Sequence, residues 1–155
     1  MASESPSREV QRPAGVRFLL VQLGYHAVRR LSARLEPLNL EPRHYGVLRA
    51  IAALEGATQQ AVGSRLELAP PRMVALIDDL EKRGLVERRR NPSDRRAYGL
   101  FLTESGRSCL EAAVAAANAE EEALLGGLDP AQREQLERLL REIAEHQGLG
   151  HRVLP

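Results

Sequence analysis

The chain of 155 residues lacks several features that would define its class at once. Its single cysteine, Cys109, cannot form an intramolecular disulfide, so nothing indicates an oxidising compartment. No stretch approaches the roughly 20 apolar residues of a membrane span, and the polar N-terminus lacks a signal-peptide core. The four histidines have no metal-binding spacing, so we expect no metal and no cofactor. The sequence therefore predicts a cytoplasmic protein that does not associate with a membrane.

Aromatic residues are also scarce, at 3% of the chain, and tryptophan is absent. Alanine, leucine, arginine and glutamate dominate instead, which favours helices over sheet. The length suits one domain with a real core. We find no glycine-rich phosphate loop, no nucleophile elbow and no paired catalytic motif, so we do not expect an enzyme.

Charge is segregated along the chain, although the formal net charge is only +1. Residues 82–96 hold seven basic and two acidic residues, a local net charge of +5. Residues 119–145 hold eight acidic residues and three arginines, a local net charge of −5. Such asymmetry suggests that one region meets a polyanion, while the alternative is an ordinary solvated face.

Apolar periodicity and turn residues predict a mainly α protein with a small β-hairpin. We expect a flexible N-terminal lead followed by a single domain, with Thr58 and Thr103 as N-caps and Asp129 with Gln132 as a capping box. The predicted strands are joined by a basic loop with Asn-Pro turn chemistry. The expected boundaries are 1–14 for the lead, 15–155 for the domain, and 85–89 and 98–102 for the strands. Helices are expected at 16–35 and 43–54, from the Thr58 cap through Leu66, within 69–84, from 103 to about 125, and from Asp129 onward.

A short helix, a tight turn and a second helix, followed at once by a basic hairpin, is the layout of a winged helix-turn-helix. The second helix would fit the major groove of DNA, which is about 12 Å wide. The hairpin could place arginines along the backbone or into the minor groove, where negative potential attracts them. This arrangement would explain why positive charge gathers at one place in the chain.

The stretch DDLEKRGLVERRRNPSDRRAYGLFLTESG, residues 78–106, closely resembles the signature of the MarR family of bacterial transcriptional regulators. The resemblance extends more loosely over about residues 16–145. It implies a winged helix-turn-helix lobe at about 43–103 and dimerisation helices at about 15–36 and 103–147. It also implies a homodimer on a pseudo-palindromic double-stranded operator, acting as a repressor released by a ligand or stress signal. The residues themselves leave repression and activation open.

The resemblance also assigns roles in the hairpin. Asp94 and Arg96 would form a supporting pair, with Arg95 beside them, and the wing tip would enter the minor groove. Arg88, Arg89 and Arg90 would contact phosphates, which position a protein without reading sequence.

The recognition helix departs from the family pattern. It opens with two prolines and Arg72, the only obvious reader of a base edge, while Val74 and Ala75 could contact thymine methyl groups. Asp78 and Asp79 would be repelled by phosphates that they approached. We therefore expect the wing to supply an unusually large share of the affinity; a dimeric scaffold that has lost DNA binding is the alternative.

Three further sets of residues have two interpretations each. Apolar residues of the first and last helices could form a dimer interface or an intramolecular core: Leu20, Leu136, Leu139, Leu140 and Ile143. By the resemblance, a small aromatic or phenolic effector could bind between the helices, although the tyrosines could simply pack. The residues that could line such a cleft are Phe18, Tyr25, His26, Arg29, His44 and Tyr45. Cys109 could sense oxidants, but a core cysteine is the simpler interpretation.

Overall fold

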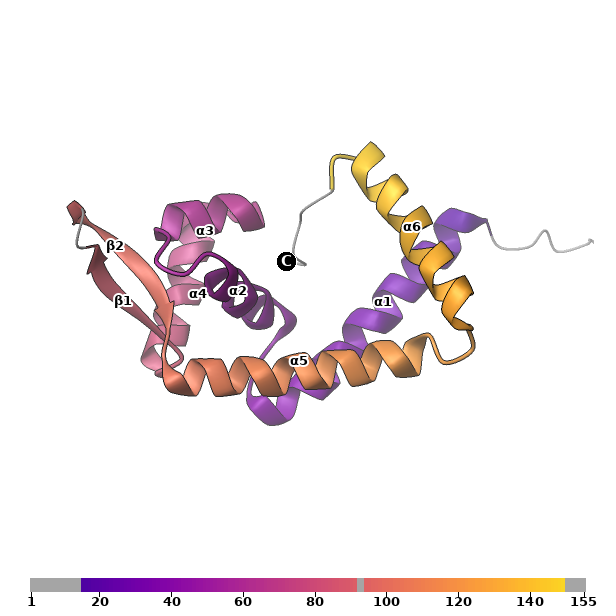
Figure 1. Cartoon of the computed structure of the whole chain (residues 1–155), viewed down its shortest axis with the longest axis horizontal. Coiled ribbons are helices and arrows are strands. Elements are labelled where there is room, and N and C mark those ends of the chain that lie inside the picture. The colour runs from indigo at the N-terminus through magenta and orange to yellow at the C-terminus, as the bar shows by residue number, and fades with distance from the viewer. Residues whose placement is uncertain (1–14, 92–93, 150–155) are drawn as a thin grey trace, which may run out of the picture.

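The computed structural model describes residues 15–91 and 94–149, so the predicted N-terminal lead, residues 1–14, lies outside the described residues. Six α-helices and one antiparallel hairpin confirm the expected fold class within that part (Figure 1). The elements are α1 (Val16–Leu35), a 3-10 turn η1 (Glu36–Leu38), α2 (Pro42–Ala53), α3 (Gln59–Leu66), α4 (Pro70–Lys82), β1 (Val86–Asn91), β2 (Asp94–Leu102), α5 (Glu104–Leu124) and α6 (Pro130–His146).

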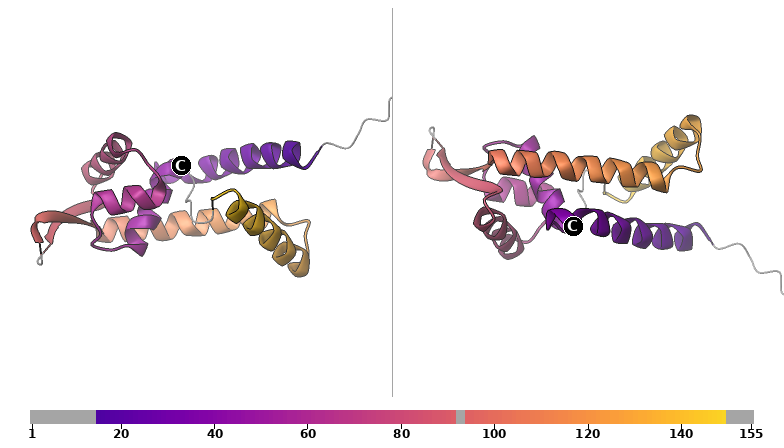
Figure 2. Two further views of the ribbon diagram at one scale, coloured as in Figure 1. Left: turned by 90° about the horizontal axis from the view of Figure 1, so that it is seen from above. Right: turned by 90° about the horizontal axis from the view of Figure 1, so that it is seen from below.

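The molecule has a lobe at one end and long helices at the other. Helices α2, α3 and α4 gather beside the hairpin, and α5 runs from this lobe along the length of the molecule (Figure 1). Helix α1 lies beside α5 as the second long arm, and α6 folds back near their far ends (Figure 2). This arrangement separates a compact lobe from an extended helical region.

The buried core lies mainly in the lobe. One side of α4 is buried, through the apolar residues Met73, Leu76, Ile77 and Leu80. It packs against apolar residues of α2 and of the hairpin, including Leu48, Ile51 and Leu100. By contrast, α6 has no buried residue, so it contributes little to the core of a single chain.

The predicted helix boundaries agree with the observed caps. The Thr58 hydroxyl accepts a hydrogen bond from the Ala61 N–H at 3.2 Å, and the Thr103 hydroxyl accepts one from the Gly106 N–H at 2.9 Å. Asp129 and Gln132 form the reciprocal capping box that starts α6. Each side chain satisfies a backbone donor that a helix start leaves without a partner.

The prediction that residues 90–97 form the connecting loop was wrong, because the strands continue through most of this basic segment. β1 extends to Asn91 and β2 starts at Asp94, with Arg88 opposite Leu100 and Arg90 opposite Tyr98. The ladder is made by backbone groups, so exposed arginines do not end it. The hairpin is therefore longer than the apolar pattern indicated.

The segment after α2 makes an additional backbone pairing that the sequence analysis missed. The Gly56 N–H donates to the Leu100 carbonyl, and the Leu100 N–H donates to the Ala57 carbonyl, both at 2.9 Å. A Cβ atom on Gly99 would lie 2.5 Å from the Gly56 carbonyl oxygen, so this approach requires glycine in β2. The pairing ties the base of the hairpin to the lobe.

Candidate nucleic-acid interface

Helices α3 and α4 form a helix-turn-helix, with Glu67 in the left-handed conformation between them at φ 52°. Burial of one face of α4 fixes which side of the helix points outward. Arg72, Val74, Ala75, Asp78 and Asp79 are all exposed, as predicted from the sequence. The proposed reading residues and the two aspartates therefore share the outward side of α4.

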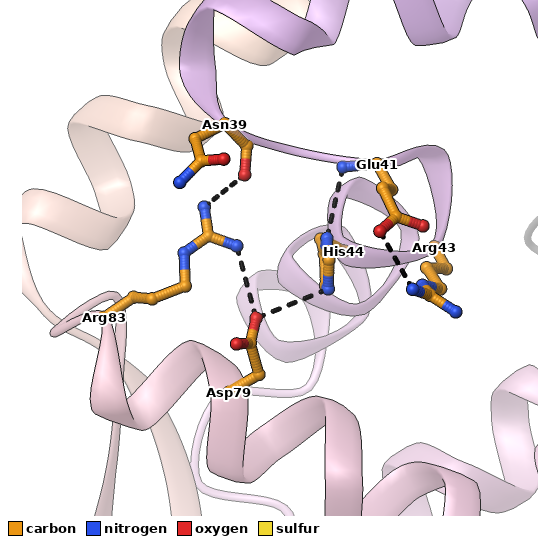
Figure 3. A network of polar contacts seen from close by, with 6 residues as sticks. All are labelled: Asn39, Glu41, Arg43, His44, Asp79 and Arg83. Atoms are coloured by element: carbon orange, nitrogen blue, oxygen red, sulfur yellow. Dashed lines mark hydrogen bonds and ion pairs between the residues drawn. The ribbon is translucent and has the colours of Figure 1, made fainter.

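Both aspartates of α4 have positively charged partners within the chain. Asp78 forms an ion pair with Arg88 of β1 at 2.6 Å. Asp79 lies 3.3 Å from Arg83 at the end of α4 (Figure 3). These positive partners reduce the repulsion from phosphates that the two aspartates would otherwise cause. The sequence predicts a phosphate contact for Arg88 and indicates no role for Arg83.

His44 connects α2 to the same side of α4. Its Nδ1 accepts the backbone N–H of Glu41 at 3.1 Å, and its Nε2 faces Asp79 at 3.5 Å (Figure 3). The first contact requires an unprotonated Nδ1 and leaves the neutral ring with its proton on Nε2. Burial, which is the largest effect, lowers the pKa of His44 below its ordinary value.

Arg83 completes this network. One of its guanidinium nitrogens donates to the backbone carbonyl of Asn39 at 2.5 Å, while the other faces Asp79 (Figure 3). Asn39 follows η1 and adopts a left-handed conformation at φ 55°. The network therefore joins the turn after α1, the start of α2 and the recognition helix.

The three consecutive arginines of β1 lie in two different settings. Arg88 turns toward α4 and its side chain is only 25% exposed. Arg89 is 56% exposed, pairs with Glu87 and lies with its guanidinium carbon 4.8 Å from the centre of the Phe101 ring. Arg90 is exposed and donates to the Tyr98 hydroxyl at 3.3 Å. Alternation along the strand explains the opposite directions of Arg88 and Arg89.

The predicted wing tip lies largely outside the described residues. The backbone of Asp94, Arg95 and Arg96 belongs to β2. Their side chains fall outside the part that the structure describes, so the Asp94–Arg96 pair remains a prediction.

The six candidate effector residues do not come together within one chain. His44, only 7% exposed, lines a cavity of about 790 Å³ between η1, α2 and α4, together with Arg43, Arg72 and Asp79. Four of the others, Phe18, Tyr25, His26 and Arg29, are exposed on α1 and do not line this cavity. The sixth residue, Tyr45, packs in the core, in line with the alternative that the tyrosines simply pack.

The apolar faces of the long helices are left uncovered. Leu20 on α1 and Leu139, Leu140 and Ile143 on α6 are exposed, and Leu136 is partly exposed. These residues therefore do not form an intramolecular core in the described part of a single chain. Further exposed apolar residues of α1 extend the surface: Val16, Leu19, Val21, Leu23 and Val28.

Cys109 is partly buried and packs against the core. Burial raises the pKa of its thiol, which reduces the reactive thiolate at neutral pH. This environment agrees with the interpretation of Cys109 as a core residue.

Residues 15–91 and 94–149 hold neither a metal cluster nor a membrane-spanning helix. No group of three or more histidine, cysteine, aspartate or glutamate side chains is placed to hold a metal ion within these ranges. None of the helices described there combines the length and apolar character needed to cross a membrane.

The arrangement of α3, α4 and the hairpin defines a winged helix-turn-helix protein. A sequence profile of the MarR family matches residues 38–97. The chain is 30% identical over 105 residues to the transcriptional regulator HosA of Escherichia coli O111:H-, covering 68% of this chain and 78% of HosA. The chain belongs to the MarR family of transcriptional regulators, as its sequence signature predicted.

Solved structures extend the similarity to nearly the whole chain. CouR of Rhodococcus jostii RHA1 bound to p-coumaroyl-CoA is 33% identical, with a TM-score of 0.73 over 86% of this chain and 96% of that one. The transcriptional repressor CouR bound to a 23-mer DNA duplex is 31% identical, with a TM-score of 0.77 over 92% of this chain and 99% of that one.

Proposed function

We propose that this regulator binds double-stranded DNA in a sequence-specific way, as a homodimeric repressor whose DNA binding responds to a small molecule or stress signal. The observation that carries the proposal is the outward side of α4 next to a hairpin with exposed Arg89 and Arg90. A similar protein, the repressor CouR, has been solved on a DNA duplex. The role is binding rather than catalysis, and the expected location is the cytoplasm.

Within this function, α4 occupies the major groove. Arg72 reads a base edge, and Val74 and Ala75 contact thymine methyl groups. Arg89 and Arg90 contact phosphates, and the tip residues Arg95 and Arg96 reach the minor groove, with Asp94 supporting them. Residues of about 43–103 form this DNA-binding lobe.

The dimer uses the helices of about 15–36 and 103–147. Its support is the uncovered apolar surface of α1 and α6, because water-exposed patches of this kind mark interaction sites. A two-fold dimer presents two recognition helices and therefore suits a pseudo-palindromic operator.

The effector is an aromatic or phenolic compound. The support is the relative CouR, whose solved complex contains p-coumaroyl-CoA. Phe18, Tyr25, His26 and Arg29 would contribute only if a second subunit approaches α1, because they line no cavity with His44 within one chain.

Fluorescence anisotropy tests the proposal most simply. The protein is titrated into a labelled duplex from upstream of its own gene and into a scrambled duplex of equal composition. Nanomolar binding to the first alone is expected, since specific sites are typically about 10³-fold or more tighter than non-specific ones. Equal weak binding to both duplexes would contradict sequence-specific recognition. Addition of p-coumaroyl-CoA, the compound in the CouR complex, tests whether an effector releases the duplex.

A further inference from the structure

The Arg88 side chain leaves the hairpin and contacts side chains of α4 and α3. Its Nη2 donates to Asp78 at 2.6 Å and to the Gln59 side chain at 3.1 Å. Its Nη1 contacts the other carboxylate nearby, that of Glu81. The Arg88 backbone N–H also donates to Glu81, at 3.2 Å. One guanidinium therefore joins the wing to both helices of the helix-turn-helix.

One of the two carboxylates that Arg88 contacts, that of Asp78, lies where a DNA-binding surface would least tolerate it. Asp78 is exposed, and it lies three and four residues after Ala75 and Val74, so it shares their side of α4. Any phosphate near that side meets a negative potential unless the aspartate is compensated. Burial disfavours the charged guanidinium, but the hydrogen bonds and charges of Asp78 and Glu81 together outweigh burial and raise the pKa of Arg88 above its ordinary value. Arg88 therefore stays charged and compensates the carboxylates at physiological pH.

From this geometry we infer that Arg88 is a counter-charge residue, and not a phosphate contact: it neutralises Asp78 and Glu81 where the wing meets the recognition helix. The inference rests on the proposed DNA binding. It replaces the role that the family resemblance suggested for this one arginine and leaves Arg89 and Arg90 as the phosphate contacts.

The two roles give different results in a mutant cycle. Arg88→Met is made in the wild-type chain and in an Asp78→Asn, Glu81→Gln background, and binding of the upstream duplex is measured by anisotropy. A counter-charge role predicts a loss of about tenfold or more in the wild-type background and less than about threefold in the neutral one. A phosphate contact predicts the same loss in both backgrounds, with a salt slope shallower by about one.

Arg89→Met is the matched control. It removes the same charge from the neighbouring position of β1, but Arg89 pairs with Glu87 and not with α4. Its loss of affinity should be equal in the two backgrounds. If Arg88→Met and Arg89→Met both behave additively with the neutralised acids, the inference is wrong.

Two further observations keep the test decisive. If Arg88→Met does not fold, the triple variant Arg88→Met, Asp78→Asn, Glu81→Gln removes the whole charge cluster and is compared with the wild type. A folded triple variant that binds within about threefold of the wild type supports the inference, and a folded one that does not bind overturns it. If the wild type itself does not bind the upstream duplex, this result contradicts the proposed function and not the role of Arg88.

Discussion

At the scale of single residues, the positive charge of this chain has two uses. Arg83 and Arg88 turn inward to carboxylates of α4, whereas Arg89 and Arg90 are exposed on the hairpin. The sequence shows only a run of arginines, because alternation along a strand and the position of α4 decide which partner each one meets. The local net charge of residues 82–96 is therefore larger than the positive charge that remains available to contact DNA.

His44 gives a prediction for the dependence of stability on pH. Its pKa is lowered in the folded chain, so between that value and the ordinary value of about 6.5 the unfolded chain binds more protons. Stability is then complete above about pH 6.5 and falls as the pH drops below it, by at most about 1.4 kcal/mol per pH unit. Protonation also removes the Nδ1 acceptor of the Glu41 N–H.

Urea denaturation at pH 7.5 and 5.5 measures this effect. His44→Asn keeps an acceptor near Nδ1 but does not titrate, so its free energy of unfolding should decrease less between the two pH values than that of the wild type. His26→Gln on the exposed surface of α1 is the control and should leave the wild-type decrease unchanged. An equal decrease in the wild type and His44→Asn would contradict the assignment.

At the scale of elements, the junction between the hairpin and α5 is set by a glycine. A Cβ atom on Gly106 would lie 1.9 Å from the Leu85 carbonyl oxygen, which also accepts the Thr103 N–H at 3.1 Å. Gly106→Ala should therefore lower the free energy of unfolding by about 1–3 kcal/mol, as overpacking usually does.

A second glycine supplies the control for this substitution. Gly24 lies in α1, and a Cβ atom added there would meet no atom of another element within 4 Å. Gly24→Ala should therefore be neutral or stabilising by up to about 1 kcal/mol. Equal stability of the two variants in urea would show that the hairpin and α5 do not pack as closely as described.

The helices could be predicted well from the sequence, and the hairpin less well. Apolar spacing and caps such as Thr58, Thr103 and Asp129 are local signals, and they located the helix starts. The arginines of β1 carry no strand pattern, so the ladder beyond Arg89 could not be expected. Contacts between distant residues were also invisible, including the pairing of Arg30 with the buried Glu120, 90 residues apart.

The candidate site, too, could be predicted only in part from the sequence. Exposure of Arg72, Val74 and Ala75 followed from the buried stripe of α4. The effector residues could not be placed from periodicity, because burial of Tyr45 and exposure of Tyr25, at 77%, depend on how α1 and α2 pack.

At the scale of the whole molecule, the uncovered faces of α1 and α6 should form the subunit interface. Leu139→Glu with Ile143→Glu places charges on exposed apolar positions of α6, so it should leave the fold of each chain intact and separate the subunits. Sedimentation should give about twice the chain mass of 17.1 kDa for the wild type and a monomer for the variant.

Gln135→Glu, at an exposed polar position of the same helix, is the matched control and should remain dimeric. A wild type that sediments as a monomer would contradict the proposed dimer, and a Leu139→Glu, Ile143→Glu variant that stays dimeric would place the interface elsewhere.

The most direct measurement is the affinity for the upstream duplex as a function of salt, for the wild type, Arg95→Ala with Arg96→Ala, and Arg72→Ala. Binding by the wing and α4 predicts that log affinity falls linearly with log salt, by about 0.9 per neutralised phosphate. The wing variant should lose more affinity than Arg72→Ala and show a shallower slope. Salt-independent binding, or full affinity without Arg95 and Arg96, would contradict the account.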